Sequence, residues 1–231
     1  MKIAIVSDIH ANIEALSSIP ESYDELWVLG DLVGYGPSPR EVIDFVRSKA
    51  AVVVRGNHDH AVAFNADPCC SPDFREMASA TLAHTRAQLR PEDLEYLSKL
   101  PVTVERSVDG TRFFLCHAAP SDPLYRYVPP ESSDWDAEAD RIAGDVLLVG
   151  HTHKPFVRCT GSATVVNPGS LGQPKRGKPL PCYAIWDRGI ELCSFEYPIA
   201  RTVARIERMP IPRRVRADLI AVLQSGGAVL V

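Results

Sequence analysis

Residues 3–10 read Ile-Ala-Ile-Val-Ser-Asp-Ile-His, an apolar run that leads directly into two side chains able to bind a metal ion. A short apolar run bounded by polar residues is typical of a strand that is buried on both faces. We expect residues 2–7 to form this strand. Residues 11–18 follow as a helix with Ile13 and Leu16 on one face. A strand followed by a helix is the repeating unit of a layered α/β fold.

The same unit repeats downstream of residue 18. Residues 26–29 and 51–54 are apolar runs that predict two more strands, and residues 39–49 predict the helix between them. Residues 71–99 predict two helices that break near Arg90-Pro91. Seven short strands then follow at 102–104, 112–116, 146–149, 156–159, 163–166, 182–186 and 190–195, before helices at 198–208 and 213–224. The seven strands suggest a second sheet packed on the first.

Length and composition narrow the class of protein. The 231 residues are 45% hydrophobic and 23% charged, which is typical of a globular protein with a large core. The net charge of −4 gives no electrostatic basis for binding nucleic acid. The first apolar run is too short for a signal peptide, and no stretch approaches the length of a membrane span. We therefore expect a cytoplasmic protein with no membrane partner, and free thiols at its 6 cysteines.

Polar motifs follow five of the apolar runs, at the point where each expected strand ends. They are Asp8-Ile-His10, Gly30-Asp31, Gly56-Asn57-His58-Asp59, His117 and Gly150-His151-Thr152-His153. Each motif alone has an ordinary structural explanation, because a lone histidine is usually a core residue and Gly-Asn favours turns. Ligands gather at the carboxyl ends of strands in α/β sheets, so the fold is expected to bring all five motifs together.

These residue types are suited to a pair of divalent metal ions. Imidazole binds Zn, Mn, Fe and Ni, and carboxylate and amide oxygens suit the harder of these ions. The expected ligands are Asp8, His10 and His153 for one ion, Asn57, His117 and His151 for the other, and Asp31 as the bridge. Two ions roughly 3.5–4 Å apart act as a clamp for in-line attack at phosphorus by a hydroxide that they share.

Two residues beside the ligand Asn57 are candidates for the catalytic proton transfer. A leaving alkoxide needs a proton, and the imidazole of His58 is expected to supply it as the general acid. Asp59 is expected to orient that ring and to keep it protonated near neutral pH.

As an ordered set, the five motifs resemble the calcineurin-like metallophosphoesterase superfamily, over residues 1–197. The phrases Gly-Asp-Leu-Val-Gly-Tyr-Gly-Pro at 30–37 and Asn-Pro-Gly-Ser at 167–170 are similar to its compact bacterial and archaeal phosphodiesterase branch. The resemblance implies a four-layer α/β/β/α sandwich, with two packed mixed sheets flanked by helices. It also implies two metals, the ligand roles given above and His58 as the acid. We expect residues 198–231 to form a helical extension packed on the 1–197 domain.

One position departs from the superfamily pattern. Many members have Asp, often followed by Arg, three residues after the bridging Asp, whereas this chain has Gly34 followed by Tyr35. The Asp-Arg pair is typical of phosphoprotein phosphatases and diadenosine tetraphosphate hydrolases, in which the Arg side chain binds phosphate. Its absence argues against those two activities and leaves the metal site intact.

The leading hypothesis is a two-metal phosphodiesterase that acts on a small phosphate ester. The alternatives are an interaction scaffold on the same fold, a nuclease, which the acidic balance disfavours, and a phosphoprotein phosphatase. Loops at 64–75 and 118–140 are expected to set substrate choice. The basic loop at 171–178 is expected to be solvated rather than to bind phosphate. The C-terminal helices can pack on the domain or on a second copy, which leaves a homo-oligomer open.

Overall fold

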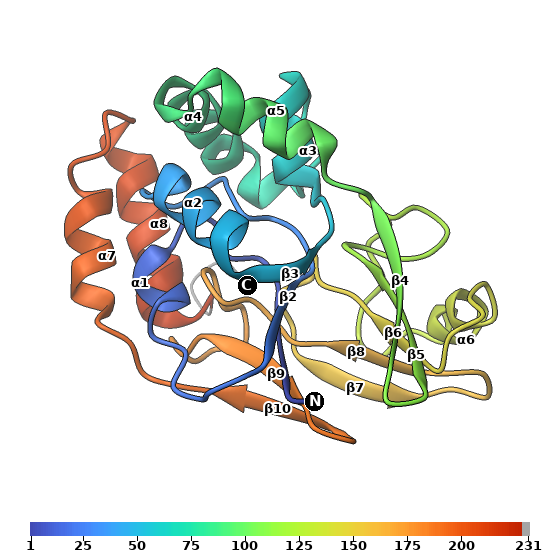
Figure 1. Cartoon of the computed structure of the whole chain (residues 1–231). Coiled ribbons are helices and arrows are strands. Elements are labelled where there is room, and N and C mark those ends of the chain that lie inside the picture. The colour runs from blue at the N-terminus through green and yellow to red at the C-terminus, as the bar shows by residue number, and fades with distance from the viewer. Residues whose placement is uncertain (228–231) are drawn as a thin grey trace.

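Two five-stranded sheets pack face to face in the computed structural model, which describes residues 1–227 (Figure 1). Helices cover the outer faces of both sheets, which confirms the expected four-layer α/β/β/α sandwich. Strand β1 (Ile3–Val6) shows how the layers form. Ile3 and Ile5 point into the core between the sheets, while Ala4 and Val6 belong to the core beneath the helices. A strand that is apolar on both faces therefore lies at the centre of the fold.

The first sheet has the strand order β10-β9-β1-β2-β3. β2 (Glu25–Val28) and β3 (Ala50–Val53) run parallel to β1, as the repeated strand–helix unit predicts. β9 (Cys182–Trp186) and β10 (Ile190–Ser194) complete this sheet as antiparallel strands. The expectation that they join the second sheet was wrong. Backbone hydrogen bonds to the open edge of β1 decide their place, and the side-chain pattern does not encode that edge.

The second sheet has the strand order β4-β5-β6-β8-β7. Its three central strands, β5 (Thr111–Cys116), β6 (Val146–Leu148) and β8 (Thr164–Asn167), are parallel. The edge strands β4 (Thr103–Val108) and β7 (Phe156–Cys159) are antiparallel to their neighbours. The carboxyl ends of the parallel strands of both sheets carry the polar motifs.

Most helices lie where the sequence predicts them. They are α1 (Ile13–Leu16), α2 (Pro39–Lys49), α4 (Pro72–Gln88), α5 (Pro91–Lys99), α7 (Ile199–Ile206) and α8 (Arg213–Ser225). Helix α3 (Asn57–Phe64) was not expected, because Gly-Asn favours a turn. The carboxylate of Asp59 accepts a hydrogen bond from the Gly56 N–H at 3.0 Å, which caps the first turn of α3.

Helix α6 (Asp134–Ala139) corrects the expectation that 118–140 is a loop throughout. Its polar composition favours a loop, but Trp135 and Ala139 are buried against the second sheet. The Trp135 Nε1–H donates to the carbonyl oxygen of Pro129 at 2.9 Å, so the indole is satisfied where it packs. Tertiary packing therefore decides this helix.

The two C-terminal helices pack on the sandwich. Helix α7 contacts α1, and α8 contacts α4. Their apolar residues, among them Ile206 and Leu219, share one cluster with Met77 of α4 and with Tyr35. We retain the division into 1–197 and 198–231 as a proposal; residues 228–231 of that extension lie outside the described residues. Within residues 1–227, no helix is both long and apolar enough to cross a membrane.

Candidate metal centre

The fold brings the seven expected metal ligands to one edge of the two sheets. Asp8, Asp31 and Asn57 follow β1, β2 and β3, while His117 and His151 follow β5 and β6. His10 and His153 come from the same loops as Asp8 and His151. All seven side chains lie in contact distance of at least one other member of the set.

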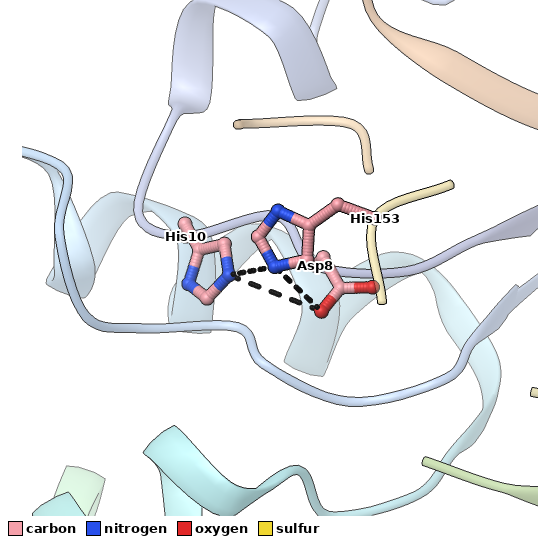
Figure 2. A group of neighbouring side chains, drawn as sticks. All are labelled: Asp8, His10 and His153. Atoms are coloured by element: carbon pink, nitrogen blue, oxygen red, sulfur yellow. Dashed lines mark hydrogen bonds and ion pairs between the residues drawn. The ribbon is translucent and has the colours of Figure 1, made fainter. Parts of the chain in front are cut away.

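Asp8, His10 and His153 form the first group (Figure 2). The His153 Nε2 lies 3.3 Å from Asp8 Oδ1 and 3.1 Å from the Nε2 of His10. The Asp8 Oδ1 is buried and accepts no hydrogen bond within residues 1–227. A buried carboxylate oxygen without a donor is costly, and two imidazole nitrogens converge beside it. This arrangement fits a divalent cation.

Asn57, His117 and His151 form the second group. The Asn57 Oδ1 lies 2.9 Å from His117 Nε2 and 3.2 Å from His151 Nδ1. Asp31 stands between the two groups, because its Oδ2 lies 3.4 Å from His117 Nε2 and 3.8 Å from His10 Nε2. The arrangement of donors fits two ions with one carboxylate shared between them.

Backbone carbonyls fix which ring nitrogen faces the centre. The Nδ1 atoms of His117 and His153 lie 2.8 and 2.7 Å from the carbonyl oxygens of Leu29 and Gln173. The Nδ1 of His10 lies 3.2 Å from the carbonyl of Val33. A carbonyl only accepts, so each ring donates from Nδ1 and presents Nε2 to the centre. Metal-binding histidines are commonly oriented by such a bond from the other ring nitrogen.

The ligand loops hold an uncommon backbone conformation. Positive φ angles occur at Asp8 (53°), His10 (45°), Asp31 (53°), His151 (65°) and His153 (61°). This left-handed region costs free energy for residues with a Cβ, and such strain clusters at functional sites. The surrounding fold therefore holds the backbone of these strand-to-loop turns in a conformation that the residues do not prefer locally, and this conformation places their side chains in the centre.

The turn at residues 167–170, after β8, forms hydrogen bonds to the loops that carry Asp8 and His151. The Asn167 Nδ2 donates to the Gly150 carbonyl at 2.6 Å, and the Ser170 Oγ donates to the Asp8 carbonyl at 2.8 Å. The Asn-Pro-Gly-Ser phrase thus holds the backbone on either side of the first ligand group, and it places no side chain of its own in that group.

Burial and charge act against each other in the centre. Burial raises the pKa of Asp8 to about 7, and His117 only partly opposes this. Burial also disfavours the ionised form of Asp31, but the neighbouring His117 and His58 outweigh it and hold its pKa well below the usual range. Burial lowers the pKa of His10 and His153 well below the usual value, which keeps both imidazoles neutral and able to bind a cation.

His58 lies beside the centre, and Asp59 does not touch its ring. The His58 Nε2 lies 3.3 Å from the Cys70 Sγ, and the backbone N–H of His58 donates to Asp31. The Asp59 carboxylate accepts from the N–H groups of Leu32, Val33 and Gly56 at 2.9, 3.2 and 3.0 Å. The expectation that Asp59 orients the imidazole was wrong, because backbone amides occupy both of its oxygens. Burial lowers the pKa of His58, with Asp31 opposing it, so the expected protonated ring at neutral pH is not favoured here.

A cavity of about 250 Å³ opens in front of the centre. Four expected ligands (Asp31, Asn57, His151 and His153) and His58 line it. The other lining residues are Tyr35 of the 30–37 phrase, Lys175, and six residues of the segments expected to set substrate choice: Cys69, Cys70, Ser71 and Phe74 from 64–75, and Tyr125 and Tyr127 from 118–140. Arg176 and Lys178 are exposed, as expected of a solvated loop, but Lys175 is half-buried and Gln173 is buried. Burial lowers the pKa of Lys175 to about 8. The expectation for the 171–178 loop was therefore wrong at these two positions.

Comparison with known proteins shows one consistent family. The profile of the calcineurin-like phosphoesterase superfamily domain matches residues 1–189. An uncharacterised protein of Methanocaldococcus jannaschii is 30% identical over 91% of this chain and 93% of its own length. The crystal structure of a metallophosphoesterase from Sphaerobacter thermophilus superposes with a TM-score of 0.81 at 30% identity, covering 96% of this chain and 98% of that one. Phosphodiesterase YfcE of Escherichia coli is 27% identical over 82% of this chain and 89% of its own length.

Proposed function

The chain belongs to the calcineurin-like phosphoesterase superfamily and is a hydrolase of phosphate esters, and from this premise we propose that it is a two-metal phosphodiesterase. The observation that carries the proposal is the convergence of five strand ends on one buried set of ligand atoms. The similarity to a named phosphodiesterase supports the choice of diesters over monoesters.

The donor set supports two divalent ions, with Mn, Fe or Zn as the expected metals and Ni also acceptable. Such ions neutralise charge on phosphoryl oxygens and lower the pKa of the attacking water. Asp8, His10 and His153 would hold one ion, Asn57, His117 and His151 the other, and Asp31 would bind both. The Nδ1–H bonds to backbone carbonyls orient the rings of His10, His117 and His153 for this role.

His58 is the proposed general acid. Its ring lines the cavity beside the ligand Asn57, within reach of a substrate that occupies that space. The proton passes from the protonated form of His58 to the leaving oxygen as the bond to phosphorus breaks. Because burial lowers the pKa of His58, this form is the minor one near neutral pH, and its proton is more readily donated. Asp59 acts as a positioning residue, because its bonds to Leu32, Val33 and Gly56 tie the loops after β2 and β3 together.

The cavity supports a small substrate. A volume of about 250 Å³ suits a phosphate with a compact substituent rather than a folded polymer. The net charge of −4 likewise gives no support to polyanion binding. Cytoplasmic location and the choice between monomer and homo-oligomer stay predictions. The interaction scaffold, the nuclease and the phosphoprotein phosphatase stay as alternatives.

Metal analysis combined with a hydrolysis assay tests the proposal. Protein purified without chelator is analysed by mass spectrometry, and bis-(p-nitrophenyl) phosphate and p-nitrophenyl phosphate are tested with and without added Mn. We expect about two metal equivalents and metal-dependent turnover with preference for the diester. A protein that stays free of metal and inactive with every divalent ion would reject the enzyme in favour of the scaffold.

A further inference from the structure

Lys175 is a cation that lines the cavity and forms no direct ion pair with any residue of the described chain. Its side chain lines the cavity together with Asp31 and His153. Its Nζ lies 3.7 Å from the centroid of the Phe74 ring, and within residues 1–227 it forms no hydrogen bond or ion pair. The aromatic face holds the ammonium by a cation–π contact and leaves its three donors available. This lysine therefore differs from Lys178 of the same loop, which is exposed.

The loop after β2 cannot supply such a cation in this chain. It carries Tyr35 in place of the Arg that many superfamily members have, and the Tyr35 ring is buried between two imidazoles. The ring centroids lie 4.8 Å from His10 and 4.6 Å from His58. A phosphoryl group that gains charge in the transition state is nevertheless stabilised by a fixed cation near its oxygens. Lys175 is the cavity residue with the charge to provide it.

The C-terminal helix fixes the loop that carries Lys175. The Gly177 N–H donates to the carbonyl of Gly226, which directly follows α8, at 2.8 Å. A Cβ on Gly226 would lie 2.2 Å from the carbonyl oxygen of Lys178, and one on Gly227 would lie 3.0 Å from the Cα of Lys175. Two glycines thus allow the end of α8 to lie directly against the 175–178 backbone. The contact restricts where Lys175 can reach.

We propose that Lys175 binds a non-bridging phosphoryl oxygen of the substrate and takes the place of the absent arginine, with the end of α8 holding it in position. This inference rests on the proposed phosphodiesterase function. The ligand that it recognises is a phosphate group, as a diester in the substrate or as inorganic phosphate.

The matched variants Lys175→Met and Lys178→Met test the proposal. Methionine keeps the unbranched apolar stem over Phe74 and removes the charge. For metal-loaded Lys175→Met we expect kcat/KM on bis-(p-nitrophenyl) phosphate to fall by about 10- to 100-fold, since one hydrogen bond to a charged group is lost. The dissociation constant of inorganic phosphate, measured by calorimetry, should rise by a similar factor. Lys178→Met should match wild type in both, and Lys175→Arg should recover part of each loss.

The calorimetric arm separates this inference from the proposed function. Metal content and thermal unfolding are measured on each variant to recognise a misfolded protein. If Lys175→Met is misfolded, Lys175→Gln replaces it. Wild-type protein that binds phosphate but hydrolyses neither ester would reject the phosphodiesterase and still test Lys175 by binding. If phosphate binding and turnover are unchanged in Lys175→Met and in Lys175→Gln, the inference is overturned and Lys175 is a packing residue.

Discussion

The His117 Nε2 lies 3.4 Å from the Asp31 Oδ2, in a buried pair that links the ends of β5 and β2. Burial by itself lowers the pKa of His117, but the charge of Asp31 and the hydrogen bond to it outweigh burial and raise the pKa to about 9. The metal-free centre therefore holds a protonated imidazole at neutral pH. A metal ion would have to displace that proton, because only the neutral ring is a ligand.

Metal affinity should accordingly rise with pH. Between pH 7 and about 9 the proton on His117 competes with the ion, so the apparent affinity should increase by up to about tenfold per pH unit and level off above the pKa. Calorimetric titration of chelator-treated protein with Mn or Zn measures this. Repeating the titration in buffers of different ionisation enthalpy should show about one proton released at pH 7 for the ion that His117 binds, and a fraction of a proton for the ion that Asp8 binds. An affinity that is flat across this range would contradict the ion pair.

Gly56 leaves room for Asp31 at the position from which it is proposed to bridge two ions. A Cβ on Gly56 would lie 2.0 Å from Asp31 Oδ1 and 2.3 Å from the Asp31 backbone nitrogen. We expect Gly56→Ala to lower the free energy of unfolding by about 1–3 kcal/mol and to reduce bound metal. The control is Gly161→Ala, where a Cβ meets nothing within 4 Å. Urea unfolding and metal content check both variants; a Gly56→Ala protein with full metal content would show that the loop adapts.

Gly34 provides the space for the His58 ring, which gives the departure from the superfamily pattern a structural consequence. A Cβ there would lie 2.6 Å from His58 Nδ1, and the φ of 87° already disfavours any side chain. On a diester that expels an unsubstituted phenolate or an alkoxide, we expect Gly34→Ala to lower kcat by at least about tenfold by displacing the acid. Gly110→Ala is the matched control, since its φ is 84° and the space around it is open. Gly110→Ala should lose stability through backbone strain and keep its activity. Equal losses of activity in Gly34→Ala and Gly110→Ala would mean that backbone strain, and not displacement of His58, lowers the rate.

The sequence was sufficient to predict the layers and that the five motifs would lie together, because both depend on patterns that local chemistry imposes. The apolar run of β1 and the motif after it predict a buried strand and a site at its end. The segments 64–75 and 118–140, expected to set substrate choice, do line the cavity, but which of their side chains meet there could not be predicted in the same way. Phe74 lies in the first turn of α4 and Lys175 in the loop before β9, and the two meet only after α8 and α4 have packed. The place of β9 at the edge of β1 likewise depends on a backbone edge and not on side chains.

The role of Asp59 illustrates a second limit. Its position next to His58 suggested a contact between the two side chains, but α3 begins at Asn57 and turns successive residues to different faces. The carboxylate therefore meets the backbone of the loop after β2 instead of the imidazole. The sequence predicted a residue that matters to the site, and the helix start decided which atoms it contacts.

The dependence of rate on the leaving group separates a catalytic His58 from a merely structural one. An acid is needed most when the leaving oxygen is strongly basic, whereas p-nitrophenolate departs as a stable anion without a proton. We therefore expect His58→Ala to reduce kcat/KM only modestly on bis-(p-nitrophenyl) phosphate. On a diester that expels an unsubstituted phenolate or an alkoxide, the loss should reach about 10²- to 10⁴-fold. Measured over a series of aryl methyl phosphates, the logarithm of the rate should fall more steeply with leaving-group pKa in the variant than in wild type. Parallel lines for the two proteins, at equal metal content, would assign His58 to the structure of the cavity wall and require another proton donor.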